Sequence, residues 1–214
     1  MAFALLLASA RRVVELHAVA TSPNWTVLDD NLGVEVSGGV LGIVGMGRIG
    51  LEVAKRGRGF DMTILYHNRN RRPKDIEDSV SATYVPSLHE LLSRADFVVA
   101  AAPGTKENYH MFDSREFAAM KTNAVFVNIG RGSLVDHHAL AGALQRGEIG
   151  SAGLDVTEPE PLPRDHPLLS LDNVIITPHR GSATMKCRMR MIHTAVKNIQ
   201  AALNDEPMPS EITS

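Results

Sequence analysis

The chain has 214 residues, of which 44% are hydrophobic and 21% charged, and its formal net charge at pH 7 is −2. This composition is typical of a globular chain, and the near-neutral charge gives no support for a nucleic acid or a membrane surface as partner. The single cysteine, Cys187, excludes an internal disulfide and a cysteine-rich metal site. We therefore expect a cytoplasmic protein, in a reducing compartment, without a bound metal.

The N-terminal segment MAFALLLASARR is an apolar run that ends in two arginines. A secretory signal carries positive charge before its apolar run, and a membrane-spanning helix needs about 20 apolar residues, so neither explanation fits. We predict one helix that continues through Val19 and packs on another element. A mitochondrial presequence stays open as an alternative, because no acid precedes Glu15.

The stretch VLGIVGMGRIG combines an apolar run with the glycine spacing G-x-G-x-x-G. Gly45 permits a tight turn, Gly47 lets the backbone approach a pyrophosphate, and Gly50 lets the helix pack closely on the strand. The helix N-terminus at Arg48 and Ile49 then supplies an anion site. The motif predicts a strand, a turn and a helix that bind a dinucleotide; a glycine-rich turn without a ligand is the alternative.

A second strand is predicted at 63–66, and the basic segment HNRNRRPK follows it. An acid at this position would accept hydrogen bonds from the adenosine ribose, but the segment contains none. Arg69, Arg71 and Arg72 instead offer charge-assisted hydrogen bonds to a 2′-phosphate, and we place Asn68 at the same site. The segment favours NADP(H) over NAD(H), which remains possible; a solvated basic loop is the alternative.

Beyond residue 72, short apolar runs alternate with helical stretches that carry their own capping residues. Strands are predicted at 97–101, 124–129, 151–156 and 174–177, and helices begin after Ser87, Asp113 and Asp136, the last of them ending before Gly147. This alternation predicts an α/β fold, a Rossmann-type doubly wound parallel sheet with helices on both faces. Ligands of such sheets gather outside the carboxyl ends of the strands.

Polar side chains follow successive predicted strands at those carboxyl ends: Arg131, Asp155, Glu160 and His179. An arginine can hold a carboxylate with two hydrogen bonds, and a histidine beside a carboxylate stays protonated near neutral pH and can donate a proton. Each residue also has an ordinary explanation as a cap, a surface acid or a turn residue. Because all four follow strands of one sheet, we expect a common site.

These residues resemble a known family, the D-2-hydroxyacid dehydrogenases, and within it the glyoxylate/hydroxypyruvate reductases. The similarity runs through LLLASARR, GMGRIG, VNIGRGSLVD, GLDVTEPEPLP and NVIITPHRGSAT, nearly the whole chain. The resemblance implies that Arg131 holds the carboxylate of a 2-oxo acid, and that His179 protonates its carbonyl. It also implies that Glu160 orients and charges His179, that Asp155 lies on the nicotinamide side, and that a reduced nicotinamide supplies the hydride.

By the same resemblance we assign further cofactor contacts and a domain plan. The additional contacts are Ala102, Pro103, Thr105, Ile129, Gly130 and Gly181. The plan has a leading helix and linker at 1–25, an NAD(P)-binding domain at 26–181, and a C-terminal helix and tail at 182–214 that belongs to a substrate domain. A substrate-binding segment precedes the first helix in the family and is absent from this sequence.

The resemblance implies an NADP(H)-dependent oxidoreductase that reduces glyoxylate, hydroxypyruvate or a related 2-oxo acid to the D-2-hydroxy acid, and a homodimer. A non-catalytic NAD(P)-binding module, or a corepressor-like interaction protein, is the alternative because the substrate segment is absent. The presence of Arg131, Glu160 and His179 favours the enzyme, because a pure binding module has no need of a proton donor.

Overall fold

The structure of the chain is a computed structural model that describes residues 1–23, 25 and 32–211. It divides into two units, Met1–Pro178 and His179–Ser214, and each is described by itself. The first unit holds the sheet, and the second holds the C-terminal helix.

This division differs from the expected domain plan. The expected start of the nucleotide-binding domain at residue 26 lies outside the described residues. The leading helix belongs to the same unit as the sheet, and the second unit begins at His179, three residues before the expected boundary.

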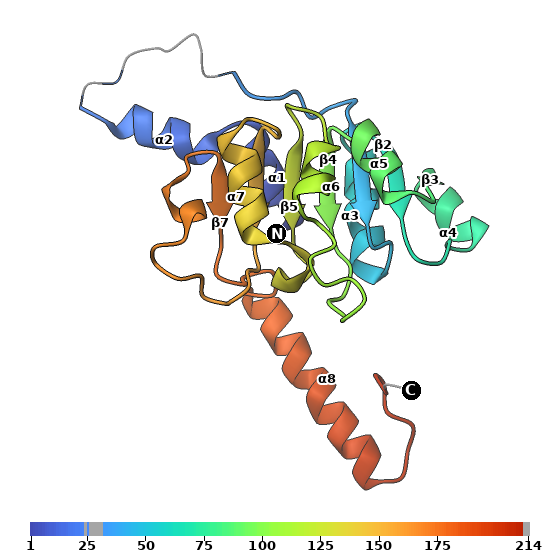
Figure 1. The fold of residues 1–214 in the computed structure, drawn as a ribbon. Helices are drawn as coiled ribbons and strands as arrows, with labels where there is room; N and C mark the ends of the chain where they lie inside the picture. Colours follow the sequence, from blue (N-terminus) through green and yellow to red (C-terminus); the bar gives the residue numbers. More distant parts are fainter. Residues whose placement is uncertain (24, 26–31, 212–214) are drawn as a thin grey trace. The chain divides into compact units, whose positions relative to one another are not determined.

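A seven-stranded parallel sheet forms the centre of the first unit, in the order β3-β2-β1-β4-β5-β6-β7 (Figure 1). The strands are β1 Val40–Val44, β2 Thr63–His67, β3 Ala82–Tyr84, β4 Phe97–Ala100, β5 Val125–Asn128, β6 Ser151–Leu154 and β7 Val174–Ile176. Val44 pairs with His67 of β2 and with Ala100 of β4, so three strands end together. The strand order reverses at β1, which creates a crevice at the carboxyl ends and confirms the predicted doubly wound fold.

Helices cover both faces of this sheet. The helices of the first unit are α1 Ala2–Ala10, α2 Val13–Thr21, α3 Arg48–Arg58, α4 Lys74–Ser79, α5 Leu88–Arg94, α6 Ser114–Ala118 and α7 His137–Gln145, with 3₁₀ turns η1 Gly132–Leu134 and η2 Pro167–Ser170. Of these, α2 contacts α1 and has no buried residue. Leu6 of α1 and Val53 of α3 share one apolar core with Ile43. Leu91 of α5 and Leu140 of α7 share the other core, on the opposite face of the sheet. Two cores form because successive residues of a strand point to opposite faces.

The predicted helix starts are confirmed by their side-chain hydrogen bonds. Ser87 accepts a hydrogen bond from the backbone of Glu90 at 3.3 Å, and Asp113 forms a capping box with Glu116. Asp136 accepts bonds from two backbone N–H groups of α7. These caps satisfy the unpaired donors of the first helical turn, so each helix begins at the predicted residue.

The N-terminal segment differs from the predicted single helix. Arg12 has a left-handed φ of 52°, and this break separates α1 from α2. In α1, Leu5 and Leu6 are buried, and the Ser9 hydroxyl donates to the carbonyl of Ala152 at 3.3 Å. The α1 helix therefore packs directly on β6.

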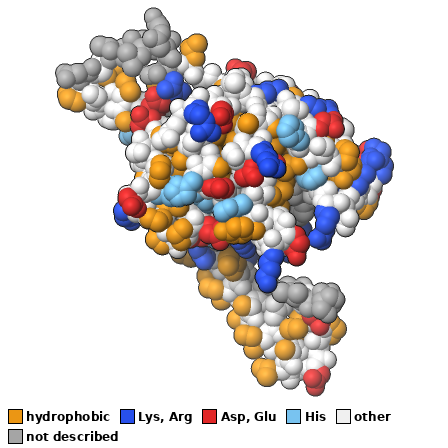
Figure 2. Space-filling model, in the orientation of Figure 1, with side chains coloured by type: hydrophobic (Ala, Val, Ile, Leu, Met, Phe, Trp, Pro, Cys, Tyr) orange, Lys and Arg blue, Asp and Glu red, His pale blue; other side chains and the backbone are white. Residues whose placement is uncertain are grey.

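The second unit contains α8, Met185–Leu203, which begins at the capping residue Thr184. Apolar side chains lie exposed along this helix, as Figure 2 shows: Met185, Met189, Met191, Ile192, Val196, Ile199 and Leu203. Among the described residues, no helix has both the length and the hydropathy needed to cross a membrane.

A buried histidine makes the stability of the first unit sensitive to acid. His137 begins α7 with 4% of its surface exposed, and burial lowers its pKa from 6.5 to about 4. The unfolded chain binds a proton at this side chain below pH 6.5, whereas the folded chain does so only near pH 4. The free energy of unfolding is therefore expected to fall by up to about 3 kcal/mol as the pH drops through this window.

Urea unfolding at pH 7, 5.5 and 4.5 measures this effect. A variant at position 137 keeps every carboxylate, so the contribution of the carboxylates to the pH dependence cancels when the variant is compared with the wild type. The His137→Gln chain is expected to lose less stability than the wild type over this range. The His138→Gln chain, which lacks the exposed neighbouring histidine, is expected to behave as the wild type. Equal pH dependence in all three chains would contradict the assignment to His137.

Candidate cofactor site

A cavity of about 540 Å³ lies at the carboxyl ends of β1, β2 and β4. Its lining comes from the loops that follow these strands: Val44, Gly45, Met46, Gly47, His67, Asn68, Arg69, Arg72, Ala101, Ala102, Pro103, Thr105, Glu107, Asn108 and Met111. Eight residues that the sequence assigns to a cofactor therefore line one cavity. The loop after β4 is closed by Asn108, whose side chain bonds the backbone of both Pro103 and Thr105 at 2.8 Å.

The three glycines of the motif occupy three different environments. Gly45 has a φ of 103°, and a Cβ there would lie 2.5 Å from the backbone nitrogen of Ala102. A Cβ on Gly50 would lie 2.1 Å from the carbonyl oxygen of Gly45, whereas one on Gly47 would meet no atom within 4 Å. Thus Gly45 and Gly50 are required by the protein's own packing, and Gly47 leaves open space where a ligand can approach the backbone.

Arg48 and Ile49, also assigned to the cofactor, form the exposed first turn of α3 and do not line the cavity. Asn68 has a structural contact, because its side-chain oxygen accepts a hydrogen bond from the backbone of Met46 at 2.6 Å. One N–H group of the glycine turn is therefore bonded to the loop after β2. This bond ties the two loops together.

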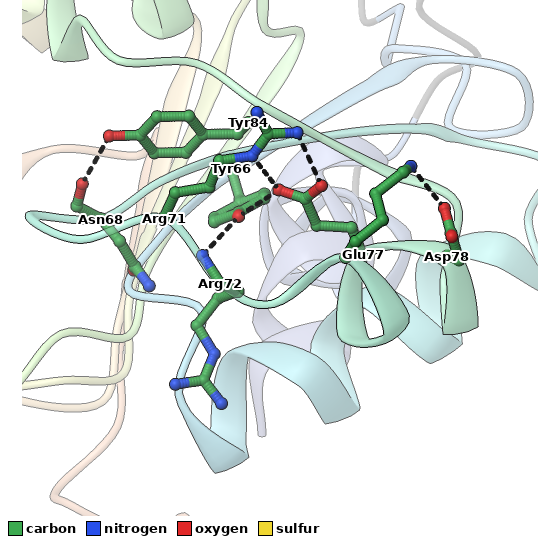
Figure 3. A network of polar contacts seen from close by, with 8 residues as sticks. Tyr66, Asn68, Arg71, Arg72, Glu77, Asp78 and Tyr84 are labelled. Carbon is green, nitrogen blue, oxygen red and sulfur yellow. Dashed lines mark hydrogen bonds and ion pairs between the residues drawn. The ribbon is translucent and has the colours of Figure 1, made fainter.

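The arginines of the basic segment separate into two groups. Arg69 and Arg72 line the cavity. Arg71 does not, because its Nε and Nη2 atoms each donate to Glu77 at 2.8 Å (Figure 3). The sequence grouped all three as phosphate ligands, and the structure places only two of them where they face the cavity.

An acid enters the cavity from a different loop. Glu107 lines the cavity beside Thr105, whose hydrogen bond lowers the pKa of this carboxyl group, with a smaller contribution from the charge of Arg69. The absence of acids in the basic segment therefore does not describe the whole cavity. No local pattern in the sequence indicated that Glu107 would lie here.

Arg131 follows β5 on a loop that a buried side chain supports. Asn128, fully buried, donates from Nδ2 to the carbonyl of Arg131 at 2.8 Å and accepts from the backbone of Gly130 at 3.0 Å. Arg131 itself is exposed, and its Nη1 donates to the carbonyl of Gly130 at 2.7 Å. Sequence reasoning missed Asn128, although a polar residue that ends an apolar strand was the available signal.

The Arg131 loop contacts the cofactor cavity through glycines. A Cβ on Gly104 would lie 3.1 Å from the Cβ of Arg131, and a Cβ on Gly130 would lie 2.6 Å from the carbonyl oxygen of Ala102. Ile129 donates its backbone N–H to Ala100 at 3.1 Å. The base of Arg131 therefore adjoins the loop after β4 that lines the cavity.

The remaining predicted site residues lie at or beyond the ends of β6 and β7. Asp155 is buried and accepts a hydrogen bond from the Thr177 hydroxyl at 2.6 Å. Glu160 lies on the exposed loop after β6. His179 and Gly181 belong to the second unit, where His179 has a left-handed φ of 53°. Across the part of the chain that the structure describes, no cluster of three His, Cys, Asp or Glu side chains could hold a metal ion.

Comparison with known proteins gives relatives across nearly the whole chain. It is 50% identical over 204 residues to glyoxylate/hydroxypyruvate reductase B from Enterobacter sp. (strain 638), covering 94% of this chain and 62% of that protein. The crystal structure of the TT0316 protein from Thermus thermophilus is 44% identical with a TM-score of 0.90, covering 99% of this chain and 66% of that one. D-lactate dehydrogenase with NAD⁺ from Lactobacillus jensenii is 28% identical, also with a TM-score of 0.90, covering 100% of this chain and 67% of that one.

The chain spans less than two thirds of the length of the reductase. Residues 3–181 match the family model of the NAD binding domain of D-isomer specific 2-hydroxyacid dehydrogenases. The match includes the glycine turn, the cavity and the loop that carries Arg131. The chain therefore belongs to the family of D-isomer specific 2-hydroxyacid dehydrogenases and contains its pyridine-nucleotide-binding domain.

Proposed function

We propose that this chain is part of an NADP(H)-dependent reductase that converts a 2-oxo acid, such as glyoxylate or hydroxypyruvate, to the D-2-hydroxy acid. The observation that carries the proposal is the contact between the Arg131 loop and the loop that lines the nucleotide cavity. This contact supports the proposal, because the base of Arg131, whose guanidinium group suits a carboxylate, adjoins the loop that lines the cavity. The reductase relatives are consistent with this chemistry.

The lining of the cavity suits a pyridine nucleotide. The open space at Gly47 and the N-terminus of α3 suit the pyrophosphate, and Arg69 and Arg72 suit a phosphate on the ribose. Among the described residues that line the cavity, Glu107 alone sets a negative charge against these two positive charges. This excess of positive charge in the cavity supports NADP(H) over NAD(H). We infer that Arg71, which does not line the cavity, contributes to this preference indirectly.

Different residues of this chain would then have different roles in the reduction. The reduced nicotinamide supplies the hydride when it is bound. Arg131 would hold the substrate carboxylate, and His179 would donate a proton to the carbonyl oxygen on which negative charge develops. Glu160 would orient His179, and Asp155 would lie on the nicotinamide side.

The proposal extends to the partner and the compartment that the sequence favours, a homodimer in the cytoplasm. Val13, Val14 and Leu16 leave apolar surface exposed on α2, which suits contact with a second copy. Light scattering of the purified chain measures its mass directly, and a monomer at all concentrations would refute the homodimer.

The test is consumption of NADPH by the purified chain with hydroxypyruvate or glyoxylate, with NADH in parallel. We expect turnover, with kcat/KM at least about tenfold higher for NADPH, as one charge-assisted hydrogen bond to the added phosphate provides. Equal or faster turnover with NADH would refute the NADP(H) preference. Binding of NADPH without turnover would refute catalysis by this chain and identify it as a nucleotide-binding module.

A further inference from the structure

A buried carboxylate lies beneath the basic loop that follows β2. Glu77, on the short helix α4, has only 2% of its side chain exposed. Its Oε1 atom accepts hydrogen bonds from the Tyr66 hydroxyl at 2.6 Å and from the Arg71 Nε at 2.8 Å, and its Oε2 atom accepts from the Arg71 Nη2 at 2.8 Å. Figure 3 shows the Arg71 guanidinium and the Tyr66 hydroxyl directed at this one carboxylate.

The hydrogen bonds continue from Glu77 into the loop itself. The Tyr66 hydroxyl accepts a bond from the backbone N–H of Arg72 at 2.9 Å. This bond fixes the backbone of Arg72, while Figure 3 shows its guanidinium pointing away from the Glu77–Arg71 pair. One carboxylate thus holds Arg71 directly and Arg72 through Tyr66.

A second branch reaches the glycine turn. The Arg71 guanidinium lies over the ring of Tyr84, 5.8 Å from its centre, and the Tyr84 hydroxyl donates to the backbone carbonyl of Asn68 at 3.2 Å. The Asn68 side chain in turn accepts the N–H of Met46. The network therefore joins α4, the basic loop and the glycine turn.

Burial makes this arrangement hard to exchange for another. A buried carboxylate without its partners is strongly disfavoured, so Arg71 cannot leave Glu77 without a large cost. The hydrogen bonds from Arg71 and Tyr66 lower the pKa of Glu77 to about 2, and burial together with Glu77 raises the pKa of Tyr66 to about 12. Glu77 stays ionised and Tyr66 stays protonated between these values, so each keeps its role as acceptor or donor.

We propose that Glu77 is a positioning residue for cofactor selection, which holds Arg71 in an ion pair and holds the loop so that Arg69 and Arg72 face the 2′-phosphate. This inference rests on the proposed NADP(H) preference. It adds an account of what holds the basic loop in place. Arg71 is then a support of the site and not a phosphate ligand.

The experiment measures the dissociation constants of 2′,5′-ADP and 5′-AMP by calorimetry, because these probes differ in the 2′-phosphate. The wild type is expected to prefer 2′,5′-ADP. In Glu77→Gln this preference is expected to fall by roughly tenfold, which corresponds to the loss of one well-placed charge-assisted hydrogen bond. The dissociation constant of 5′-AMP is expected to stay within about twofold of the wild-type value. Arg69→Gln, which removes a direct ligand, is expected to reduce the preference at least as much.

Asp78→Asn is the matched control. It removes the same charge from the next residue of the same helix, where Asp78 is 62% exposed and pairs only on the surface with Lys74 at 2.6 Å. The preference is expected to remain at the wild-type value. Tyr66→Phe keeps the packing, removes only the hydroxyl and is also expected to reduce the preference. It tests the inference independently if Glu77→Gln fails to fold. Thermal melting verifies the folding of each variant.

An unchanged preference in a folded Glu77→Gln or Tyr66→Phe chain would overturn the inference. An increased preference would also overturn it, because Arg71 released from Glu77 would then be acting as a ligand. A wild type that does not prefer 2′,5′-ADP would refute the NADP(H) preference and this inference with it. A wild-type preference that the variants retain refutes the inference alone.

Discussion

Replacement of His179 by glutamine is expected to lower kcat for hydroxypyruvate by about 100- to 10,000-fold, the range that a general acid contributes. Glutamine preserves the approximate size and polarity of the side chain but cannot deliver a proton to the carbonyl oxygen. The dissociation constant of NADPH is expected to change by less than about twofold. Steady-state kinetics and a fluorescence titration of NADPH measure the two effects separately.

His89→Gln is the control for this substitution, because His89 is an exposed histidine of α5. Its kcat is expected to equal that of the wild type. Parallel losses of kcat and NADPH affinity in His179→Gln would show that His179 supports the structure, and the assignment as proton donor would fail.

Two glycine substitutions in the same turn are expected to weaken NADPH binding alike but to differ in their effect on stability. In Gly50→Ala, the new methyl group would lie 2.1 Å from the carbonyl oxygen of Gly45, so α3 must move away from the turn. Such overpacking costs about 1–3 kcal/mol of the free energy of unfolding. Because the moved helix supplies the anion site in our proposal, NADPH affinity is expected to fall as well, by at least about tenfold.

Gly47→Ala is expected to separate binding from stability. No protein atom lies within 4 Å of the position that its Cβ would take, so the free energy of unfolding should stay within about 0.5 kcal/mol of wild type. The same methyl group would occupy the space through which we propose that a pyrophosphate approaches the backbone, so NADPH binding should weaken by at least about tenfold. Urea unfolding without nucleotide and an NADPH titration test the pair; normal NADPH affinity in Gly47→Ala would place the pyrophosphate elsewhere.

The fold could be predicted where local patterns carry the information. Apolar runs of four or five residues and capping residues such as Asp136 gave most strands and helix starts. β3 and α4 were missed, because β3, ATY, has no apolar run and α4, KDIEDS, has no apolar periodicity. The break at Arg12 was also missed, since arginine rarely adopts a left-handed conformation.

The candidate site divides in the same way. The roles of Gly45 and Gly50 follow from the turn itself and were predictable from spacing. The separation of Arg71 from Arg69 was not, because it depends on Glu77, whose burial results from tertiary packing. An acid in a short polar helix is typical of solvated surface, so the sequence contains no signal for its burial.

The pairing of Arg71 with Glu77 also has a consequence for attempts to redesign the cofactor preference. Random mutagenesis of the whole basic loop would mostly yield chains with an orphaned internal charge, and most library members would fail before their selectivity could be measured. A library restricted to Arg69 and Arg72, with Arg71 kept constant, would vary only the two arginines of the loop that line the cavity. The internal ion pair thus divides the loop into a part that engineering can vary and a part that it should leave intact.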